Sequence, residues 1–144
     1  MLENFDYGQV LAQFAHCFRA ECRRSGECLR YQIGTCVPKE RQSVLVVNPA
    51  RIASTAGCDH FMPCVLLRHA WGMTQLLNEL PYRKTKVLRA QMREYFGKTH
   101  FYRLMRKERS FTPADQQYVA DLFRRSGIEK EPAFDAYTYT YQWE

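Results

Sequence analysis

Apolar residues recur at helical spacing through much of the second half of the chain. Over residues 84–96 they repeat every three to four positions and form one face, made of Leu88, Met92, Tyr95 and Phe96. Gly97 follows, and glycine tolerates the positive φ that a tight turn requires. In the next segment, KTHFYRLMRKER, one side carries Phe101, Leu104 and Met105. The pattern predicts two consecutive amphipathic helices that meet at a glycine.

The segment TPADQQYVADLFRRSG carries both the start and the stop signals of a third helix. Thr112 is a capping residue, Pro113 suits the first helical position, and Asp115 completes a capping box. A pair of arginines precedes Gly127 at the far end, where cations interact favourably with the helix dipole. We expect the inward face to consist of Tyr118, Val119, Leu122 and Phe123.

Three weaker patterns occupy the first half of the chain. Apolar residues at near-helical spacing predict a short N-terminal helix, and they are Phe5, Val10, Leu11 and Phe14. The β-branched run over residues 43–48 predicts a strand that ends at Asn48-Pro49. Residues 64–80 predict a central core helix that Pro81 ends. Its expected inner face is Leu66, Ala70, Met73, Leu77 and Leu80, widened by Leu67 and Trp71.

The chain ends with aromatic residues at every second position, namely Tyr137, Tyr139, Tyr141 and Trp143. This alternation indicates a strand or an extended tail packed on the body. With 144 residues, of which 46% are hydrophobic, one domain over residues 1–144 is expected. We predict a mainly α fold with a short strand or hairpin. It comprises a metal-stapled, cysteine-rich half (1–80), a helix-turn-helix segment (81–127) and an aromatic tail (128–144).

The N-terminal residues lack the basic and apolar regions of a signal peptide, and no window is apolar for about 18 residues, the length that spans a bilayer. The sequence therefore predicts a cytoplasmic protein that does not enter membranes. The chain has six cysteines. In a reducing cytosol, cysteines are more often metal ligands or buried apolar residues than disulfide partners.

Three of the cysteines lie close together in HCFRAECRRSGECLR, where Cys17, Cys22 and Cys28 have the spacing C-x4-C-x5-C. Four thiolates suit a tetrahedral metal, so Cys58 is the expected fourth ligand. Zn(II) is favoured, and an iron–sulfur cluster is the alternative because it also takes cysteine ligands. The remaining interpretation is that several of these residues are simply buried thiols.

The other candidate ligands rank below these four cysteines. His16 and His60 could each replace a thiolate, but a histidine beside a cysteine more often supports a ligand than binds the metal itself. Cys36 and Cys64 are predicted to take no part.

Positive charge is concentrated in one region of the chain. Residues 81–127 contain twelve Lys or Arg against four Asp or Glu, a net charge of +8, whereas the whole chain carries +6. Such a basic segment suits a polyanionic partner, above all nucleic acid. A solvated cationic surface is the plain alternative. The sequence contains no motif of a nucleophile elbow or a zinc protease, so we expect no enzymatic activity.

The order of helix, glycine turn, basic helix and capped helix is that of a helix-turn-helix core. Accordingly, YFGKTHFYRLMRKERSFTPADQQYVADLF resembles the Cro/repressor-type helix-turn-helix, with one residue fewer between Gly97 and the inward aromatic pair. This resemblance implies duplex DNA as the partner. The candidate contacts are Lys98, Thr99, His100, Tyr102, Arg103, Arg106 and Lys107.

Over its whole length the chain is similar to an uncharacterised bacterial family of small domain-of-unknown-function proteins. The similarity rests on ENFDYGQV, CLR, VNP, FGKTHFYR and FDAYTYTYQW, and it implies no activity. The sequence thus predicts a non-enzymatic DNA-binding protein with a structural metal, a class that includes transcriptional regulators. One alternative is an RNA- or ribosome-associated protein that uses the same basic face. Another is an adaptor that binds an acidic protein.

Overall fold

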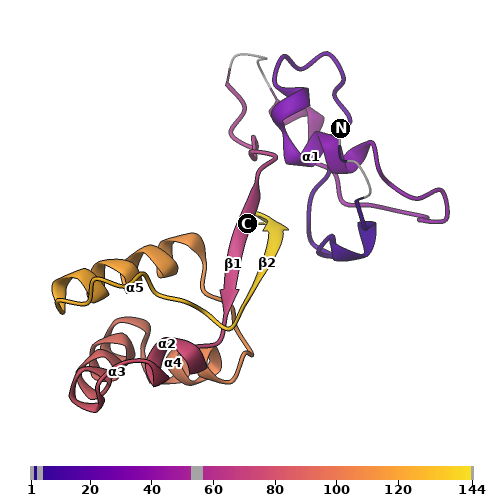
Figure 1. The fold of residues 1–144 in the computed structure, drawn as a ribbon. Coiled ribbons are helices and arrows are strands. Elements are labelled where there is room, and N and C mark those ends of the chain that lie inside the picture. Colours follow the sequence, from indigo (N-terminus) through magenta and orange to yellow (C-terminus); the bar gives the residue numbers. More distant parts are fainter. Residues whose placement is uncertain (1, 3–4, 53–56, 144) are drawn as a thin grey trace. The chain divides into compact units, whose positions relative to one another are not determined.

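The structure is a computed structural model that describes residues 2, 5–52 and 57–143. The chain divides into two compact units. Residues 1–66 and 141–144 form one, hereafter the cysteine unit, and residues 67–140 form the other, hereafter the helical unit (Figure 1). The predicted boundary between residues 80 and 81 falls inside the helical unit.

The helical unit contains the three helices that the sequence predicts in its second half. They are α3 (Tyr82–Phe96), α4 (Lys98–Met105) and α5 (Pro113–Arg125). Gly97 alone separates α3 from α4, and its φ of 79° confirms the predicted glycine turn. At the start of α5, the Thr112 hydroxyl accepts from the Asp115 N–H (3.2 Å), while the Asp115 carboxylate accepts from the Thr112 N–H (2.9 Å). The predicted capping box is therefore confirmed.

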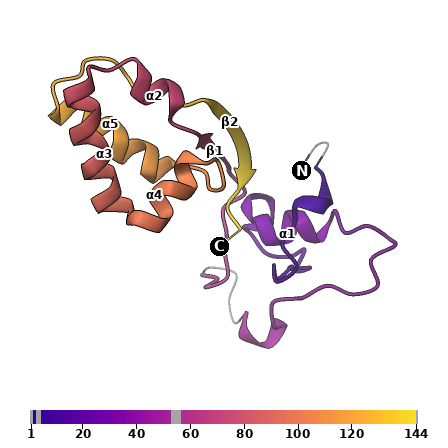
Figure 2. The same cartoon turned by 90° about the horizontal axis from the view of Figure 1, so that it is seen from below.

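These helices enclose the larger of two hydrophobic cores. α3 and α5 meet through Tyr95 and Tyr118, whose rings stack with centroids 3.5 Å apart, and α4 packs beside α3 (Figure 2). The inward faces predicted for α4 and α5 are buried at Phe101, Leu104, Val119, Leu122 and Phe123. Fourteen buried residues form this core, which makes the helical unit well packed.

The predicted central helix over residues 64–80 is wrong. The segment instead forms strand β1 (Leu66–Trp71) and the short helix α2 (Thr74–Asn78). Gly72 lies between them with a φ of 75°, a conformation that a helix cannot include. β1 pairs with β2 (Ala136–Tyr141) in a two-stranded antiparallel sheet, so the predicted C-terminal strand is confirmed.

Backbone partners that are distant in the sequence stabilise β1 as a strand. Ala70 exchanges two backbone hydrogen bonds with Phe111, of 3.1 and 2.7 Å, on the side of β1 away from β2. Strands depend on such long-range partners, and helical periodicity in a short apolar segment cannot reveal them. The tertiary pairing therefore overrides the local pattern.

The cysteine unit has little regular structure. Its one α-helix among the described residues is α1 (Leu29–Gly34), accompanied by the 3-10 turns η1 (Tyr7–Gln9), η2 (Ser25–Glu27) and η3 (Pro49–Arg51). The predicted N-terminal helix is wrong, because the Asp6 carboxylate accepts from the Gly8 N–H and stabilises a tight turn instead. The predicted strand over residues 43–48 is also wrong. Only Val46 pairs, in an isolated bridge with His16.

The core of the cysteine unit is small. Among the described residues, four buried side chains form its central cluster, namely Phe14, Leu29, Ile33 and Met62. The end of the chain packs against this cluster, with Trp143 edge-on to Phe14 at a centroid distance of 5.3 Å. A unit of this length with so small a core is expected to need a further source of stability.

The described residues form a mixed fold of five α-helices and a two-stranded antiparallel sheet, which confirms the predicted combination of helices with a short strand or hairpin. Within that part of the chain, no helix combines the length and apolar character needed to cross a bilayer.

Candidate metal centre and candidate nucleic-acid interface

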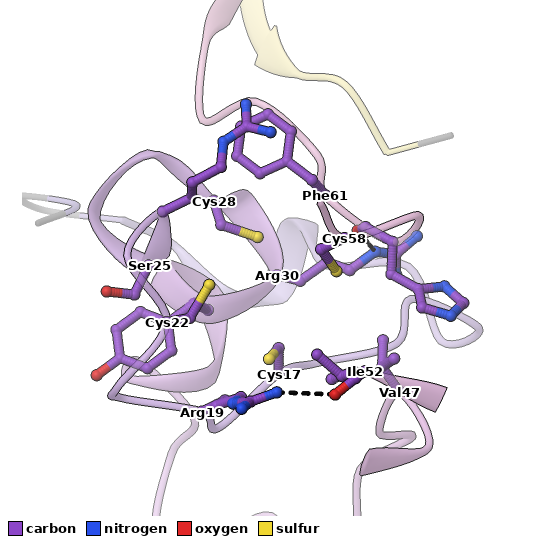
Figure 3. Close-up of a pocket in the computed structure, with 13 residues that line it drawn as sticks. Cys17, Arg19, Cys22, Ser25, Cys28, Arg30, Val47, Ile52, Cys58 and Phe61 are labelled. Carbon is purple, nitrogen blue, oxygen red and sulfur yellow. Dashed lines mark hydrogen bonds between the residues drawn. The ribbon is translucent and has the colours of Figure 1, made fainter. Parts of the chain in front are cut away.

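The four cysteines predicted as ligands surround one small cavity. Cys17, Cys22, Cys28 and Cys58 all line it, and Figure 3 shows their sulfur atoms turned towards a common space. The cavity measures about 20 Å³, which is room for a single small ion or water molecule. Three of the thiols are close in sequence, whereas Cys58 comes from a segment thirty residues further along the chain.

Local backbone structure places each cysteine at the cavity. Cys28 ends η2 and precedes α1, and it forms an antiparallel bridge with Pro63. The Cys17 N–H donates to the Arg30 carbonyl at 3.0 Å. Gly34 packs so closely on the Cys17 carbonyl that a Cβ at Gly34 would lie 2.5 Å from its oxygen. The backbone of Cys17 is therefore fixed against α1.

Arginine side chains tie these segments together. Arg30 Nε donates to the His60 carbonyl (3.0 Å), and Arg30 Nη1 donates to the Ala15 carbonyl (2.8 Å). Arg30 therefore holds two carbonyls that each lie two residues from a cavity cysteine, Cys17 or Cys58. On another side of the cavity, Arg19 Nη1 donates to the Ile52 carbonyl at 2.9 Å (Figure 3).

The lining of the cavity also carries positive charge. Arg19, Arg24 and Arg30 all line it, and the Arg24 guanidinium stacks on Phe61 at 3.2 Å from the ring centroid. Sequence reasoning missed these arginines, although four occur in the same fifteen-residue stretch as the three cysteines.

Four cysteine thiols match the ligands of a tetrahedral metal in number and type, but their side chains are not placed as a metal centre. Within the described residues, no group of three or more His, Cys, Asp or Glu side chains is placed so that it could hold a metal ion as it stands. The four sulfur atoms would have to come closer together to reach a zinc–sulfur distance of about 2.3 Å. Four thiols around a space of single-ion size nevertheless provide the number and type of ligand that Zn(II) takes.

The residues ranked lower as ligands have separate locations. His16 is buried, and both of its ring nitrogens form hydrogen bonds. Nε2 lies 2.7 Å from the Tyr7 hydroxyl, and Nδ1 lies 3.0 Å from the Leu45 carbonyl oxygen. His60 lines the cavity beside Cys58, whereas Cys36 and Cys64 do not line it. Burial raises the pKa of the Cys64 thiol, which keeps it protonated. Cys64 packs against the small core instead.

All seven predicted nucleic-acid contacts lie on the surface of the helical unit. Lys98, Thr99, His100, Tyr102 and Arg103 are exposed on α4, and Arg106 and Lys107 are exposed just after it. The side chains of Arg103 and Arg106 lie within 4.0 and 2.7 Å of the Glu108 carboxylate. Hydrogen bonds from Arg106 lower the pKa of Glu108, so this carboxylate stays charged at neutral pH.

Two further predicted contacts also have partners inside the unit. Lys107 Nζ lies 3.5 Å from the Asp135 carboxylate, and the backbone of Lys107 has a φ of 60°. His100 Nδ1 lies 2.9 Å from Arg109 Nη1. The exposed surface around α4 is therefore partly neutralised by its own acidic residues.

The geometry defines a small two-unit protein that has a cysteine-lined cavity in one unit and a basic helical surface in the other. The chain belongs to a family of unknown function, DUF6078, whose model matches residues 1–143. Neither a curated protein nor a solved structure matches the chain. The similarity to an uncharacterised family is therefore confirmed, and the comparisons assign no activity.

Proposed function

We propose that the protein is a non-enzymatic DNA-binding protein whose cysteine unit is held together by one structural metal ion, with Zn(II) the favoured metal. The observation that carries the metal part is the convergence of Cys17, Cys22, Cys28 and Cys58 on one cavity. The four-residue core of that unit supports it, because a loop-rich unit with a small core gains much of its folding free energy from a bound metal. Bound zinc would supply structural cross-linking and no reaction chemistry.

Metal content of the anaerobically purified protein tests this part. We expect one equivalent of zinc per chain, and loss of both the metal and the stability of the cysteine unit in Cys22→Ser, because a structural site contributes folding free energy directly. Cys36→Ser is the matched control, since Cys36 does not line the cavity, and it should keep its metal.

Two other results would change the conclusion. A brown protein with charge-transfer absorption would identify an iron–sulfur cluster instead of zinc. Less than about half an equivalent of zinc or iron, together with unchanged melting of Cys22→Ser, would leave four free thiols and no metal centre.

The helical unit is the part that we propose binds duplex DNA. Its support is the net charge of +8 on residues 81–127, together with the exposure of every predicted contact on and after α4. Lys98, Arg106 and Lys107 are proposed as phosphate contacts, and Arg103 as the reader of a base edge. Thr99, His100 and Tyr102 complete the proposed surface.

Binding of the full-length protein to random duplex and single-stranded pools at several salt concentrations tests this part. We expect preference for duplex and an affinity that falls steeply with salt, because phosphate contacts release counterions. Arg103→Ala should weaken binding by about 1–3 kcal/mol and relax preference at one base pair. Equal affinity for both pools would contradict the duplex proposal.

One observation favours the RNA-associated alternative as a second candidate. Tyr137 and Tyr139 on β2 are 41% and 64% exposed, and exposed aromatic rings stack on unpaired bases. Preference for the single-stranded pool, lost in Tyr139→Ala, would support that function. Failure to bind either pool at low salt would favour the adaptor alternative, in which the basic surface binds an acidic protein.

A further inference from the structure

The exposed face of α3 carries more positive charge than α4, where the sequence places the DNA contacts. α3 contains five Lys or Arg and a single acidic residue, Glu94, and so contributes +4 of the +8 on residues 81–127. α4 carries two cations and no acidic residue. Half of the net charge of the segment therefore lies on the first helix.

Four of these cations form a continuous stripe, defined by Arg83, Lys86, Arg89 and Arg93. Their spacing of three, three and four residues places them along one side of the helix, opposite the buried Leu88 and Met92. All four are exposed. The stripe runs for about 15 Å at 1.5 Å per residue.

The stripe differs from the α4 surface in its lack of internal partners. Acidic residues of the helical unit pair with cations elsewhere, since Glu108 binds Arg103 and Arg106, Asp135 binds Lys107, Asp121 binds Arg124, and Glu79 binds Lys130. Among the described residues, no acidic side chain forms a salt bridge with any of the four stripe residues. Arg89 contacts the Met105 sulfur at 3.4 Å, which leaves its charge uncompensated.

This arrangement is unfavourable for α3 itself. Like charges three or four residues apart on one face destabilise a helix. The first turn of α3 contains no acidic residue, so its cations also oppose the helix dipole. A polyanion laid along the stripe would remove both penalties.

We infer that the Arg83–Lys86–Arg89–Arg93 stripe is a main phosphate-binding surface of the protein and lies along the backbone of duplex DNA. Over about 15 Å of the duplex axis, one strand presents roughly four phosphates, at one per 3.4 Å. Every stripe residue can therefore meet a phosphate. The inference rests on the proposed function. It assigns a major part of the contact with the DNA phosphate backbone to α3 instead of the α4 surface.

Two triple variants of the full-length protein separate these surfaces. Arg83→Gln/Lys86→Gln/Arg93→Gln neutralises the stripe and leaves the Arg89 contact with Met105 in place. Arg103→Gln/Arg106→Gln/Lys107→Gln is the matched control, because it removes the same charge from the same unit. Duplex affinity is measured against salt concentration for both variants and for wild type, and melting is followed by circular dichroism.

We expect the stripe variant to reduce the slope of log K against log salt by about 2.7, at about 0.9 for each lost phosphate contact. The control should reduce it by less. The charge-preserving Arg83→Lys/Arg93→Lys should keep the wild-type slope. If the triple variant fails to fold, single Gln variants at Arg83, Lys86 and Arg93 should each reduce the slope by about 0.9.

The outcomes distinguish the inference from the function on which it rests. Wild-type slope and affinity in the folded stripe variant would overturn the stripe while leaving duplex binding intact. Absence of duplex binding by the wild-type protein at low salt would overturn both. Loss of binding to an acidic protein, with no effect on DNA, would assign the stripe to a protein partner and overturn its role on DNA.

Discussion

Asp135 joins three segments of the helical unit through one carboxylate. Its oxygens accept from the Thr74 and Gln75 N–H groups at the start of α2, at 3.2 and 3.0 Å, and lie 3.5 Å from Lys107. Burial of the carboxylate by itself raises its pKa. The backbone hydrogen bonds from Gln75 and Thr74, aided by Lys107, outweigh burial and lower the pKa below the ordinary value.

The lowered pKa of Asp135 predicts a pH-dependent contribution to stability. A carboxyl group whose pKa is lower in the folded state stabilises the fold above its unfolded pKa of about 3.9, and this contribution is lost as the pH falls through the folded pKa. We expect Asp135→Asn to lower the free energy of unfolding by about 0.5–1.5 kcal/mol at pH 7, the net contribution of one hydrogen bond, because the amide keeps only one acceptor oxygen and no charge.

Urea unfolding of both proteins at pH 7 and at about pH 2.5 measures this contribution, with the lower value chosen because it is below the ordinary carboxyl pKa. The difference between wild type and Asp135→Asn should shrink at the lower pH, because protonation of Asp135 removes the charge that distinguishes it from asparagine. A difference that stays constant between the two pH values would show that the charge of Asp135 adds nothing to its hydrogen bonds with the Thr74 and Gln75 N–H groups.

Gly72 is constrained by the same carboxylate. Its φ of 75° favours glycine, and a Cβ at this position would lie 2.3 Å from the Asp135 carboxylate. The turn from β1 into α2 therefore depends jointly on a residue without a side chain and on a carboxylate sixty-three positions later in the chain.

At the scale of elements, α5 is the helix whose boundaries are set most completely by local sequence. Thr112 and Asp115 satisfy each other's backbone N–H groups, and Pro113 occupies the first turn. Loss of a capping hydroxyl costs about 0.5–2 kcal/mol. We expect Thr112→Ala to destabilise the helical unit by this amount and Thr112→Ser to have little effect, measured by thermal unfolding at 222 nm. Equal stability of both variants would contradict a role for the cap.

At the scale of the whole molecule, the two units depend on different sources of stability. The helical unit has fourteen buried core residues and contains α3, α4 and α5, whereas the core cluster of the cysteine unit has four. If the proposed metal stabilises the cysteine unit alone, its removal should leave most of the helix content unchanged.

Chelation of the purified protein tests that separation. We expect the ellipticity at 222 nm to fall only slightly, because α1 is the one α-helix among the described residues of the cysteine unit. The four cavity thiols should at the same time become reactive towards a thiol reagent, since metal-bound thiolates are protected. Cooperative loss of all helical signal on chelation would show that the two units unfold together.

The sequence by itself determined the features whose causes are local. The amphipathic spacing of α3 and α4, the glycine between them, the capping box of α5 and the aromatic alternation of β2 each depend on residues a few positions apart. Local spacing also singled out Cys17, Cys22 and Cys28. Cys58 was added from the number of ligands that a tetrahedral metal takes, and the structure places it at the same cavity.

Only the tertiary structure decided the features that rest on distant partners. Residues 66–71 form a strand because Phe111 and β2 supply backbone hydrogen bonds, which the helical spacing of its apolar residues could not reveal. The role of Arg30 depends on carbonyls fifteen and thirty residues away. Glu108 is a local partner of the α4 surface, two residues from Arg106, whereas folding brings the distant Asp135 to Lys107. Among the described residues, no acidic side chain forms a salt bridge with the α3 stripe. Local geometry fixes which residues share a face, whereas strand pairing and the ion pair between Lys107 and Asp135 are set by the path of the whole chain.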